Sequence, residues 1–396
     1  MNSIILISAF GDISHLRNSR PFKIYSALAE RYKVCYITSD FDHWAKDYKN
    51  IANLPQATYL HVSAYERSLS FRRILSHLQF AYALNRYLNE LKEVPDVICC
   101  IMPTSTSAYV CGRFCKKNGI RFVVDVIDLW PDSLYPITKF SWLFKFLCYP
   151  WRKITEKTYG YADVITAESM KYRDEAKKYN KKAIANCTYL GINRQKIGFL
   201  LKQSNVSILK PTDELWICYG GHLGKSYDFD AILAALLYIQ EKGIKYKCLF
   251  VGDGELREEI ETFATLHQLN IYITGVQPYA DYLKYLSFCD IAINVFKENT
   301  KVVHSYKFND YVALNLFVLN SLMGETAQMI NEYKIGLNFD FKEYFLKDAL
   351  YEVCSNWEKY EAWKDNNVAL IDALLDEKKI YGNMIDLFLY RNNDLQ

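Results

Sequence analysis

The sequence predicts an α/β protein with two doubly wound domains, for three reasons. A chain of 396 residues is too long for one ordinary domain. Short apolar runs alternate with helical segments, and each run is continuous, as parallel strands buried on both faces require. The alternation restarts after a polar stretch at 203–214. We therefore expect domains at 1–200 and 213–377, joined by a linker at 201–212.

In the first half, the apolar runs that read as strands are IILISAF, VCYITSD, DVICCIM, RFVVDVID, ADVITAES and IANCTYLG. Helical segments at about 21–31, 71–92 and 105–118 separate them, and a long aromatic helical region covers 134–160. The N-terminal NSIILISAFG is short and lacks a basic leader, so we interpret it as a first strand rather than a signal peptide.

The second half repeats the pattern with LWICYGG, YKCLFVGDG, NIYITG, DIAINVF and Phe317–Ser321 as strands. Its first helices are expected at about 228–242, 255–267 and 279–287. A last helix, at about 378–391, is a candidate to cross back to the first domain. Two such domains are expected to face each other across an interdomain cleft, because ligands of open α/β folds bind at the carboxyl ends of the strands.

Charge is unevenly distributed along the chain. Residues 1–200 carry 29 Lys and Arg against 17 Asp and Glu, whereas residues 201–396 carry 19 against 28. The basic first half indicates an anionic partner, either nucleic acid or a membrane surface. No RNA-binding, helix-turn-helix or zinc-finger pattern occurs, so we expect no nucleic acid. No run of about 18 uncharged apolar residues occurs either, so we expect no membrane-spanning helix.

The 11 cysteines are scattered, without a CxxC pair or histidine partners at zinc spacing. Cys111 and Cys115 share a helix face with apolar neighbours, which favours burial over metal binding. Scattered free thiols are typical of a reducing cytosol. We therefore expect a cytoplasmic protein without a metal site.

The segment with the most specific chemistry runs from Asp290 to Thr326. A helix is expected to open near Tyr306, which places Lys307 and Asp310 on one face of its first turn. A cation and free backbone N–H groups at a helix start suit a phosphate, and a carboxylate one turn later suits sugar hydroxyls. A solvated helix face with a weak Lys–Asp pair is the alternative.

Glycines follow two strands of the second half. In the stretch YGGHLGK, Gly221 allows a tight turn and the close approach of an anion, and Lys225 adds a positive charge. Gly252 follows the strand CLFV in a similar turn. Ordinary strand–helix connections would also explain both loops.

Other polar candidates lie at a strand end and in a loop. Asp128, which follows the strand RFVVDVID, can accept a proton or a hydroxyl hydrogen bond from the cleft, or else cap the next turn. We assign that capping role to Asp132. Glu298 and His304 precede the Lys307 helix and can line its pocket, with surface positions as the alternative.

The segment LYPITKFSWLFKFLCYPWRKITEKTYGY mixes cations with aromatic residues. Against the single Glu156, its cations are Lys139, Lys145, Arg152, Lys153 and Lys157. Basic aromatic helices of this kind lie in membrane interfaces. Because the whole first half is basic, we favour a helix on an anionic membrane surface over a buried helix packed on the sheet.

These segments resemble GT-B-fold glycosyltransferases of the retaining group 1 family, especially its bacterial surface-polysaccharide members, over nearly the whole chain. DLWPDSL resembles the family's DLWPES segment, YGGHLGK its YaGnLGk loop and FVGDGELREEI its VGdGp segment. SYKFNDYVALNLFVLNS is similar to P-x-K-x-x-E-Y-l-A-x-G-k-P-v-v. GETAQMINEYKIGL is similar to the closing G-E-x-a-x-x-I segment.

The resemblance implies roles for particular residues. Lys307 corresponds to the lysine that neutralises the donor diphosphate, and Asp310 to the acid that binds the nucleotide ribose. Val302 stands where the family has an acid for the donor sugar, and Glu298 or His304 is its candidate replacement. Lys225 would assist Lys307 with the leaving diphosphate, and Asp128 would act on the acceptor side. The other donor-binding positions are Gly221, His222, Gly252 and Glu325.

The resemblance also implies transfer of a hexosyl or N-acetylhexosaminyl group, with retention, from a UDP- or GDP-sugar. The acceptor would be a glycan or a polyprenyl-diphosphate-linked oligosaccharide, and no metal or other cofactor would be needed. Capsule, O-antigen or exopolysaccharide synthesis at the inner face of the cell membrane would be the setting. A sugar-nucleotide 2-epimerase of the same fold and a non-catalytic partner in a polysaccharide assembly complex are the alternatives.

Overall fold

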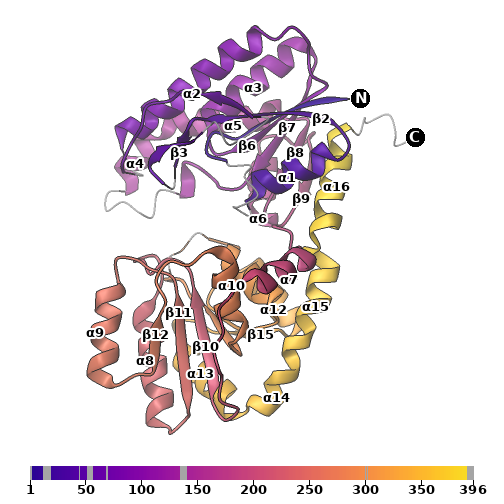
Figure 1. Cartoon of the computed structure of the whole chain (residues 1–396). Coiled ribbons are helices and arrows are strands. Elements are labelled where there is room, and N and C mark those ends of the chain that lie inside the picture. Colours follow the sequence, from indigo (N-terminus) through magenta and orange to yellow (C-terminus); the bar gives the residue numbers. More distant parts are fainter. Residues whose placement is uncertain are drawn as a thin grey trace. The chain divides into compact units, whose positions relative to one another are not determined.

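The computed structural model describes residues 2–11, 19–43, 45–50, 57–67, 70–133, 141–298, 300 and 302–389. These residues form two compact units, each a doubly wound α/β domain (Figure 1). The first unit holds the described residues up to Tyr189 and those from Lys378 onward, and the second runs from Leu190 to Glu377. The predicted fold class of two Rossmann-like domains is thereby confirmed.

The first unit is built on a parallel sheet with the strand order β5-β2-β1-β6-β7-β8-β9. The order reverses at β1, which pairs with β2 on one side and with β6 on the other. The strands are β1 (Ser3–Ile7), β2 (Lys33–Ser39), β5 (Ala57–Leu60), β6 (Val97–Met102), β7 (Arg121–Val126), β8 (Val164–Ala167) and β9 (Ile184–Cys187). A short antiparallel pair is formed by β3 (Phe41–Asp42) and β4 (Asp47–Tyr48).

Helices connect these strands, and serine side chains cap several of their N-termini, as Ser70 does for α2. The helices are α1 (Arg20–Ala29), α2 (Phe71–Asn89), α3 (Ser105–Asn118), α4 (Ser141–Leu147), α5 (Tyr149–Tyr161), α6 (Met170–Lys177) and α16 (Glu377–Leu389). The long helical region expected at 134–160 is therefore two helices over its described part. They separate at Cys148 because Pro150, in the first turn of α5, has no N–H to continue the preceding helix.

Helix α16 completes the core of the first unit. Tyr381, Met384, Ile385 and Phe388 are buried in one cluster with residues of β1, β6 and α1. The last helix, which the sequence made a candidate to cross back, therefore lies in the first unit. None of the described helices is long and apolar enough to cross a membrane.

The second unit has a parallel sheet of order β12-β11-β10-β13-β14-β15, which reverses at β10. The strands are β10 (Leu215–Gly220), β11 (Tyr246–Val251), β12 (Ile271–Ile273), β13 (Ile291–Asn294), β14 (Phe317–Asn320) and β15 (Gly336–Asn338). The helices that the sequence predicted are α8 (Phe229–Glu241), α9 (Arg257–His267), α10 (Tyr279–Ser287) and α11 (Tyr306–Ala313). Those it did not predict are α7 (Arg194–Gln203), α12 (Glu325–Tyr333), α13 (Leu346–Ser355), α14 (Trp357–Glu361), and α15 (Asn366–Leu370) with the single turns η3 (Ala362–Asp365) and η4 (Ile371–Leu375) on either side.

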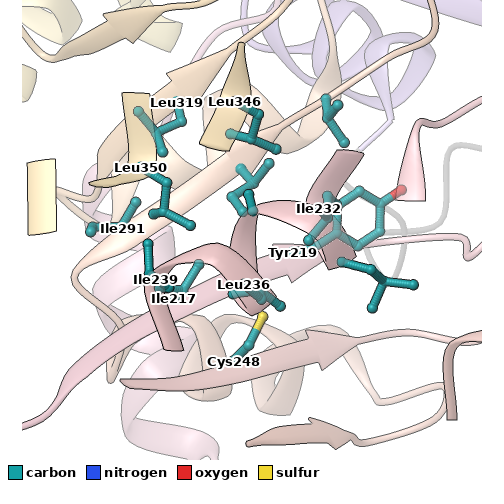
Figure 2. Close-up of a cluster of buried hydrophobic side chains, with 14 of the residues drawn as sticks. Ile217, Tyr219, Ile232, Leu236, Ile239, Cys248, Ile291, Leu319, Leu346 and Leu350 are labelled. Carbon is teal, nitrogen blue, oxygen red and sulfur yellow. The ribbon is translucent and has the colours of Figure 1, made fainter. Parts of the chain in front are cut away.

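The core of the second unit lies between its sheet and the helices α8 and α13, which pack on each other. Figure 2 shows this cluster, with Ile217 and Tyr219 of β10 among the side chains of both helices. Leu236 of α8 and Leu350 of α13 are fully buried there. Because Tyr219 is part of this cluster, the core fixes the position at which β10 ends and the next loop begins.

The chain passes between the two units at Tyr189–Leu190 and again at Glu377–Lys378. The first passage comes before the linker expected at 201–212. That segment belongs to the second unit, since Ser204 Oγ donates to Asp281 (2.5 Å) and Lys210 pairs with Asp290. Beside the passages, Ile192 forms a parallel bridge with Asp376, and its backbone N–H donates to the Leu375 carbonyl (2.7 Å).

A buried ion pair ties several strand ends of the first unit together. Arg20, at the start of α1, donates to both carboxylate oxygens of Asp125 in β7 (2.7 and 2.8 Å). The same guanidinium donates to the Thr188 carbonyl just after β9 (2.6 Å), and Thr166 of β8 donates to Asp125 (2.7 Å). Both charged side chains are fully buried, so neither charge can be removed alone without leaving the other uncompensated.

We expect Asp125→Ala to lower the free energy of unfolding of the first unit by about 3–5 kcal/mol, because it leaves Arg20 buried without its counter-ion. The control is Asp386→Ala, which removes the exposed pair with Arg31 and should cost less than about 1 kcal/mol. Urea denaturation followed by far-UV circular dichroism measures both. Equal losses in the two variants would contradict a structural role for the buried pair.

Candidate functional site

The candidate site lies in the second unit, at the carboxyl ends of its central strands. The loops that follow β10, β11 and β13 start there, next to the point where the strand order reverses. Open α/β sheets bind ligands at such a switch point. The loop after β13 leads into α11, the helix that carries Lys307 and Asp310.

The start of α11 is held in place by a side-chain cap. Ser305 Oγ accepts from the Phe308 N–H (3.3 Å) and donates to Asn294 Oδ1 at the end of β13 (2.9 Å). The helix therefore begins at Tyr306, as the sequence predicted, and Lys307 falls in its first turn. Free backbone N–H groups and the positive end of the helix dipole lie in the same turn.

The ammonium group of Lys307 is enclosed by aromatic rings. Its Nζ lies 3.7 Å from the ring centre of Tyr227, 4.0 Å from that of Tyr219 and 5.4 Å from that of Phe296. It donates to the Tyr219 hydroxyl (2.7 Å). Burial lowers the pKa of Lys307 well below its usual range, and no carboxylate among the described residues pairs with it. Lys307 Nζ is thus removed from water, and its neighbours are mostly ring faces, which favour its charged form.

The glycine loops lie against this cation. A Cβ on Gly221 would stand 3.7 Å from Cε and 3.8 Å from Nζ of Lys307, so the backbone of the loop passes directly beside the ammonium group. A Cβ on Gly252 would lie 1.9 Å from the Gly221 carbonyl oxygen, which no side chain can tolerate. The structure therefore brings Lys307, Gly221 and Gly252 together, as the sequence suggested.

His222 and Lys225 bind the neighbouring loop rather than Lys307. His222 Nε2 lies 2.8 Å from a carboxylate oxygen of Glu255, and His222 Nδ1 lies 3.1 Å from the Asp253 carbonyl. The backbone N–H of Lys225 donates to Glu255 (3.2 Å), while its side chain is exposed. These contacts join the loops after β10 and β11 and leave the Lys225 ammonium group at the surface.

Asp310 lies three residues after Lys307 and accepts a hydrogen bond from the Tyr279 hydroxyl (2.7 Å) at the start of α10. Tyr279 stacks on Tyr282 with ring centres 5.9 Å apart. Asp310 is partly exposed, so its carboxylate is held in one orientation and still reaches the surface.

The loop candidates have mixed positions. His304 Nε2 lies 2.8 Å from Asn309 Oδ1, and burial lowers the pKa of His304 although Asn309 and Glu325 favour its charged form. Glu325 is the first residue of α12 and is buried. Glu298 is exposed after β13, and Val302 is 37% exposed. His304 therefore lies just before α11 and packs on its first turns through Asn309 and Phe308, whose ring centre is 5.5 Å from that of His304.

The sequence analysis did not predict the row of asparagines at the ends of three strands, two of which are buried. Asn294 of β13 donates to Asn320 of β14 (2.8 Å), which donates to Asn338 of β15 (2.7 Å). Asn320 also donates to the Leu322 carbonyl (2.8 Å). Asn294 and Asn320 are fully buried, and Asn294 binds the cap Ser305. An asparagine as the last residue of three strands was the available signal.

Asp128 belongs to the first unit, where both of its oxygens serve the following turn. It accepts from the Leu129 N–H and from Trp130 Nε1, each at 2.7 Å. Burial raises the pKa of Asp128 despite these bonds. The capping role assigned to Asp132 therefore falls to Asp128, and Asp132 instead pairs with Arg152 (3.3 Å). Asp128 acts by orienting Trp130, whose ring lies 4.4 Å from the Arg73 guanidinium.

No group of three or more His, Cys, Asp or Glu side chains within the described ranges is arranged to hold a metal ion. Each of the eleven cysteines, all within those ranges, carries a free thiol. Cys111 and Cys115 are buried, as expected from their helix face.

Two Rossmann-like units in one chain are the elements of the GT-B fold. No family model and no curated protein matches the sequence. Among solved structures, Anabaena HepE in complex with UDP and glucose matches with a TM-score of 0.64 and 12% identity, covering 98% of this chain and 99% of that chain. WaaG, a glycosyltransferase involved in lipopolysaccharide biosynthesis, matches with a TM-score of 0.65 and 12% identity, covering 98% of this chain and 100% of that chain. A Listeria monocytogenes structure assigned as a UDP-N-acetylglucosamine 2-epimerase matches with a TM-score of 0.57 and 10% identity, covering 97% of this chain and 94% of that chain. These likenesses establish the fold.

We expect Gly252→Ala to destabilise the second unit by roughly 3 kcal/mol or more, because the added methyl group clashes with the Gly221 carbonyl and a positive φ is strained. Gly243→Ala is the matched control, since Gly243 also has a positive φ but open space around its Cβ position. Its cost should stay near 1 kcal/mol. Denaturant unfolding measures the loss of unfolding free energy in both variants. Similar losses would contradict the close packing of the loops after β10 and β11.

Proposed function

We propose that this protein is a glycosyltransferase that moves a sugar, with retention, from a UDP- or GDP-sugar to a glycan or a polyprenyl-diphosphate-linked acceptor. The observation that carries the proposal is the buried Lys307 ammonium group, which lies beside Gly221 and has aromatic rings rather than a carboxylate around it. A cation in this state is suited to a diphosphate. The GT-B structures described with UDP are consistent with such a donor.

In the proposed reaction, the acceptor hydroxyl oxygen bonds the anomeric carbon on the face from which the diphosphate leaves. The bond between that carbon and the diphosphate oxygen breaks, and the hydroxyl proton passes to the leaving diphosphate. Negative charge then grows on the leaving diphosphate. Lys307 and the N–H groups at the start of α11 stabilise it electrostatically, a contribution that is large in water-excluded sites. Asp310, held by Tyr279, binds the nucleotide ribose. We propose that Lys307 and these N–H groups neutralise the diphosphate without the help of a metal ion.

We further propose that the protein acts in capsule, O-antigen or exopolysaccharide synthesis, on the inner face of the cell membrane. Supporting this location, Trp142, Phe146 and Leu147 of α4 are more than 60% exposed, and Tyr149 at the start of α5 is 57% exposed. Such aromatic residues suit a membrane interface. Lys139, part of the segment proposed from sequence, lies outside the described residues.

A sugar-nucleotide 2-epimerase is the second candidate, favoured by the fold likeness to the Listeria structure. A non-catalytic binding partner is the third, favoured by Val302, which stands where the resembled family has an acid. Incubation with UDP- and GDP-sugars in the absence of acceptor separates the first two, because epimer formation would replace the transferase proposal. Donor binding without any turnover in the presence of lipid-linked acceptors would favour the third.

Thermal unfolding with UDP tests the donor site directly. At a hundredfold excess over its Kd, UDP should stabilise the wild-type protein by about 2.7 kcal/mol. Lys307→Ala should bind UDP at least thirtyfold more weakly, since losing one partner of a buried charge pair costs about 2–5 kcal/mol. The control Lys242→Ala, at the C-terminal end of α8, should bind as the wild type does. Equal binding by both variants would reject Lys307 as the diphosphate contact.

UDP binding should also take up protons. Burial lowers the pKa of free Lys307, and an adjacent diphosphate raises it, so between the two pKa values the complex holds more protons than the free protein. UDP affinity should therefore fall as pH rises through this window. Calorimetry in two buffers of different ionisation enthalpy measures the uptake. Lys307→Arg, which stays charged, should abolish it, and uptake that persists in this variant would assign the proton to another group.

A further inference from the structure

A positively charged groove of about 470 Å³ lies between α2 and α3 of the first unit. Figure 1 shows these two helices next to each other, and they pack on one another. The polar side chains lining the groove are Asn85, Asn89, Arg113, Lys116, Lys117 and Tyr161. No Asp or Glu occurs in the sequence of either helix.

The three cations of the groove are exposed and form no ion pair with any carboxylate in the described part of the chain. The Arg113 guanidinium lies 5.9 Å from the ring centre of Tyr109, and Lys116 Nζ lies 5.6 Å from that of Tyr161. Aromatic rings therefore position two of the cations while leaving their charges uncompensated.

The dipole of α3 explains only part of this arrangement. Lys116 and Lys117 lie in its last turn, where cations are favourable. Arg113 lies one turn earlier, and the Asn85 amide comes from α2, whereas the Asn89 amide donates to the Asn85 carbonyl of its own helix (2.7 Å). The convergence of three cations of α3 with an amide of α2 on one groove suits an anion.

The same face of α2 carries an exposed apolar stripe. Phe71 and Leu78 precede Asn85 at seven-residue intervals, and Leu75 and Tyr82 precede Asn89 in the same way. Residues seven apart lie on one helix face. Ile74 adds to the stripe, and the five apolar side chains range from 47% to 90% exposed. The stripe therefore leads along α2 into the groove.

We infer that this face binds an anionic glycerophospholipid of a bilayer surface, with the lipid phosphate in the groove and the stripe of α2 at the depth of the acyl chains. The inference rests on the membrane docking included in the proposed function and names the headgroup chemistry and residues for it. A soluble phosphate would need the groove but not the stripe. Nucleic acid would not favour the aliphatic Ile74, Leu75 and Leu78 beside it.

This surface differs from the basic helix that the sequence singled out. There, Lys153 pairs with Glu156 (2.6 Å), and Arg152 pairs with Asp132 and lies 3.8 Å from Glu156. Their charges are thus partly compensated within the protein. The cations on α3 are not, so they contribute more to an anionic surface.

Co-sedimentation of the full chain with vesicles tests the inference. Binding to vesicles of phosphatidylcholine and phosphatidylglycerol should weaken about a hundredfold when Arg113, Lys116 and Lys117 are all replaced by Gln. The matched control replaces Lys33, Lys181 and Lys182, three exposed cations elsewhere in the first unit, by Gln and should lose less than about tenfold. Equal losses in the two triple variants would overturn the groove as the site and leave only a net-charge effect.

The apolar stripe is tested with Leu75→Ser/Leu78→Ser, which should weaken binding to the same vesicles while keeping all cations. Unchanged binding would overturn the lipid assignment. Excess glycerol phosphate should compete poorly with vesicles for the protein. If glycerol phosphate instead displaced all of the protein from the vesicles, the lipid assignment would be overturned in favour of a soluble anion. If the triple variant is unstable, the single variant Arg113→Gln replaces it in the test, and its affinity for the vesicles should fall several-fold. Stabilisation by UDP, measured on every variant, reports separately on the proposed donor site.

Discussion

The asparagine row at the ends of β13, β14 and β15 is the constraint on which the candidate site depends. Parallel strands that end inside a protein leave polar groups without partners, and an unsatisfied buried amide costs about 1–3 kcal/mol. Each asparagine both donates and accepts, so Asn294, Asn320 and Asn338 satisfy one another across three strands. Asn294 also receives the hydrogen bond of Ser305, and Ser305 sets where α11 begins. The orientation of Lys307 therefore follows from a hydrogen-bond network that lies outside its own helix.

The surroundings of Lys307 have a cost and a benefit. Removing an ammonium group from water is unfavourable, and cation–π contacts offset only part of that penalty. Tyr219 and Tyr227 supply these contacts, and Tyr219 is itself fixed in the core between α8 and the sheet. An amine already removed from water needs little rearrangement of its surroundings when an anion arrives and favours its charged form, which is the condition for strong electrostatic stabilisation. Packing in the core and charge at the site are linked through one tyrosine.

Much of the fold follows from local patterns in the sequence, whereas the site follows only in part. Continuous apolar runs indicated the central strands of both sheets, and the family resemblance implied one donor site for Lys307, Gly221 and Gly252, which the structure brings together. Helix α13 and the asparagine row were not predicted, since burial of neutral amides and packing against α8 depend on partners distant in sequence. His304 and Asp128 looked functional because they are titratable residues in loops. The structure adds their contacts with Asn309 and Trp130, which a pattern of residue types does not reveal.

The bridge between Ile192 and Asp376 has a consequence for how the chain is organised. It brings the entry and exit of the second unit together, and a Cβ on Gly191 would lie only 2.5 Å from Glu377 Cα. The second unit is thus an insertion whose two ends meet, while α16 supplies the first unit with the core residues that follow the insertion. The half that carries Lys307 therefore begins and ends at one place in the fold, and fraying of either end is opposed by the pairing of both.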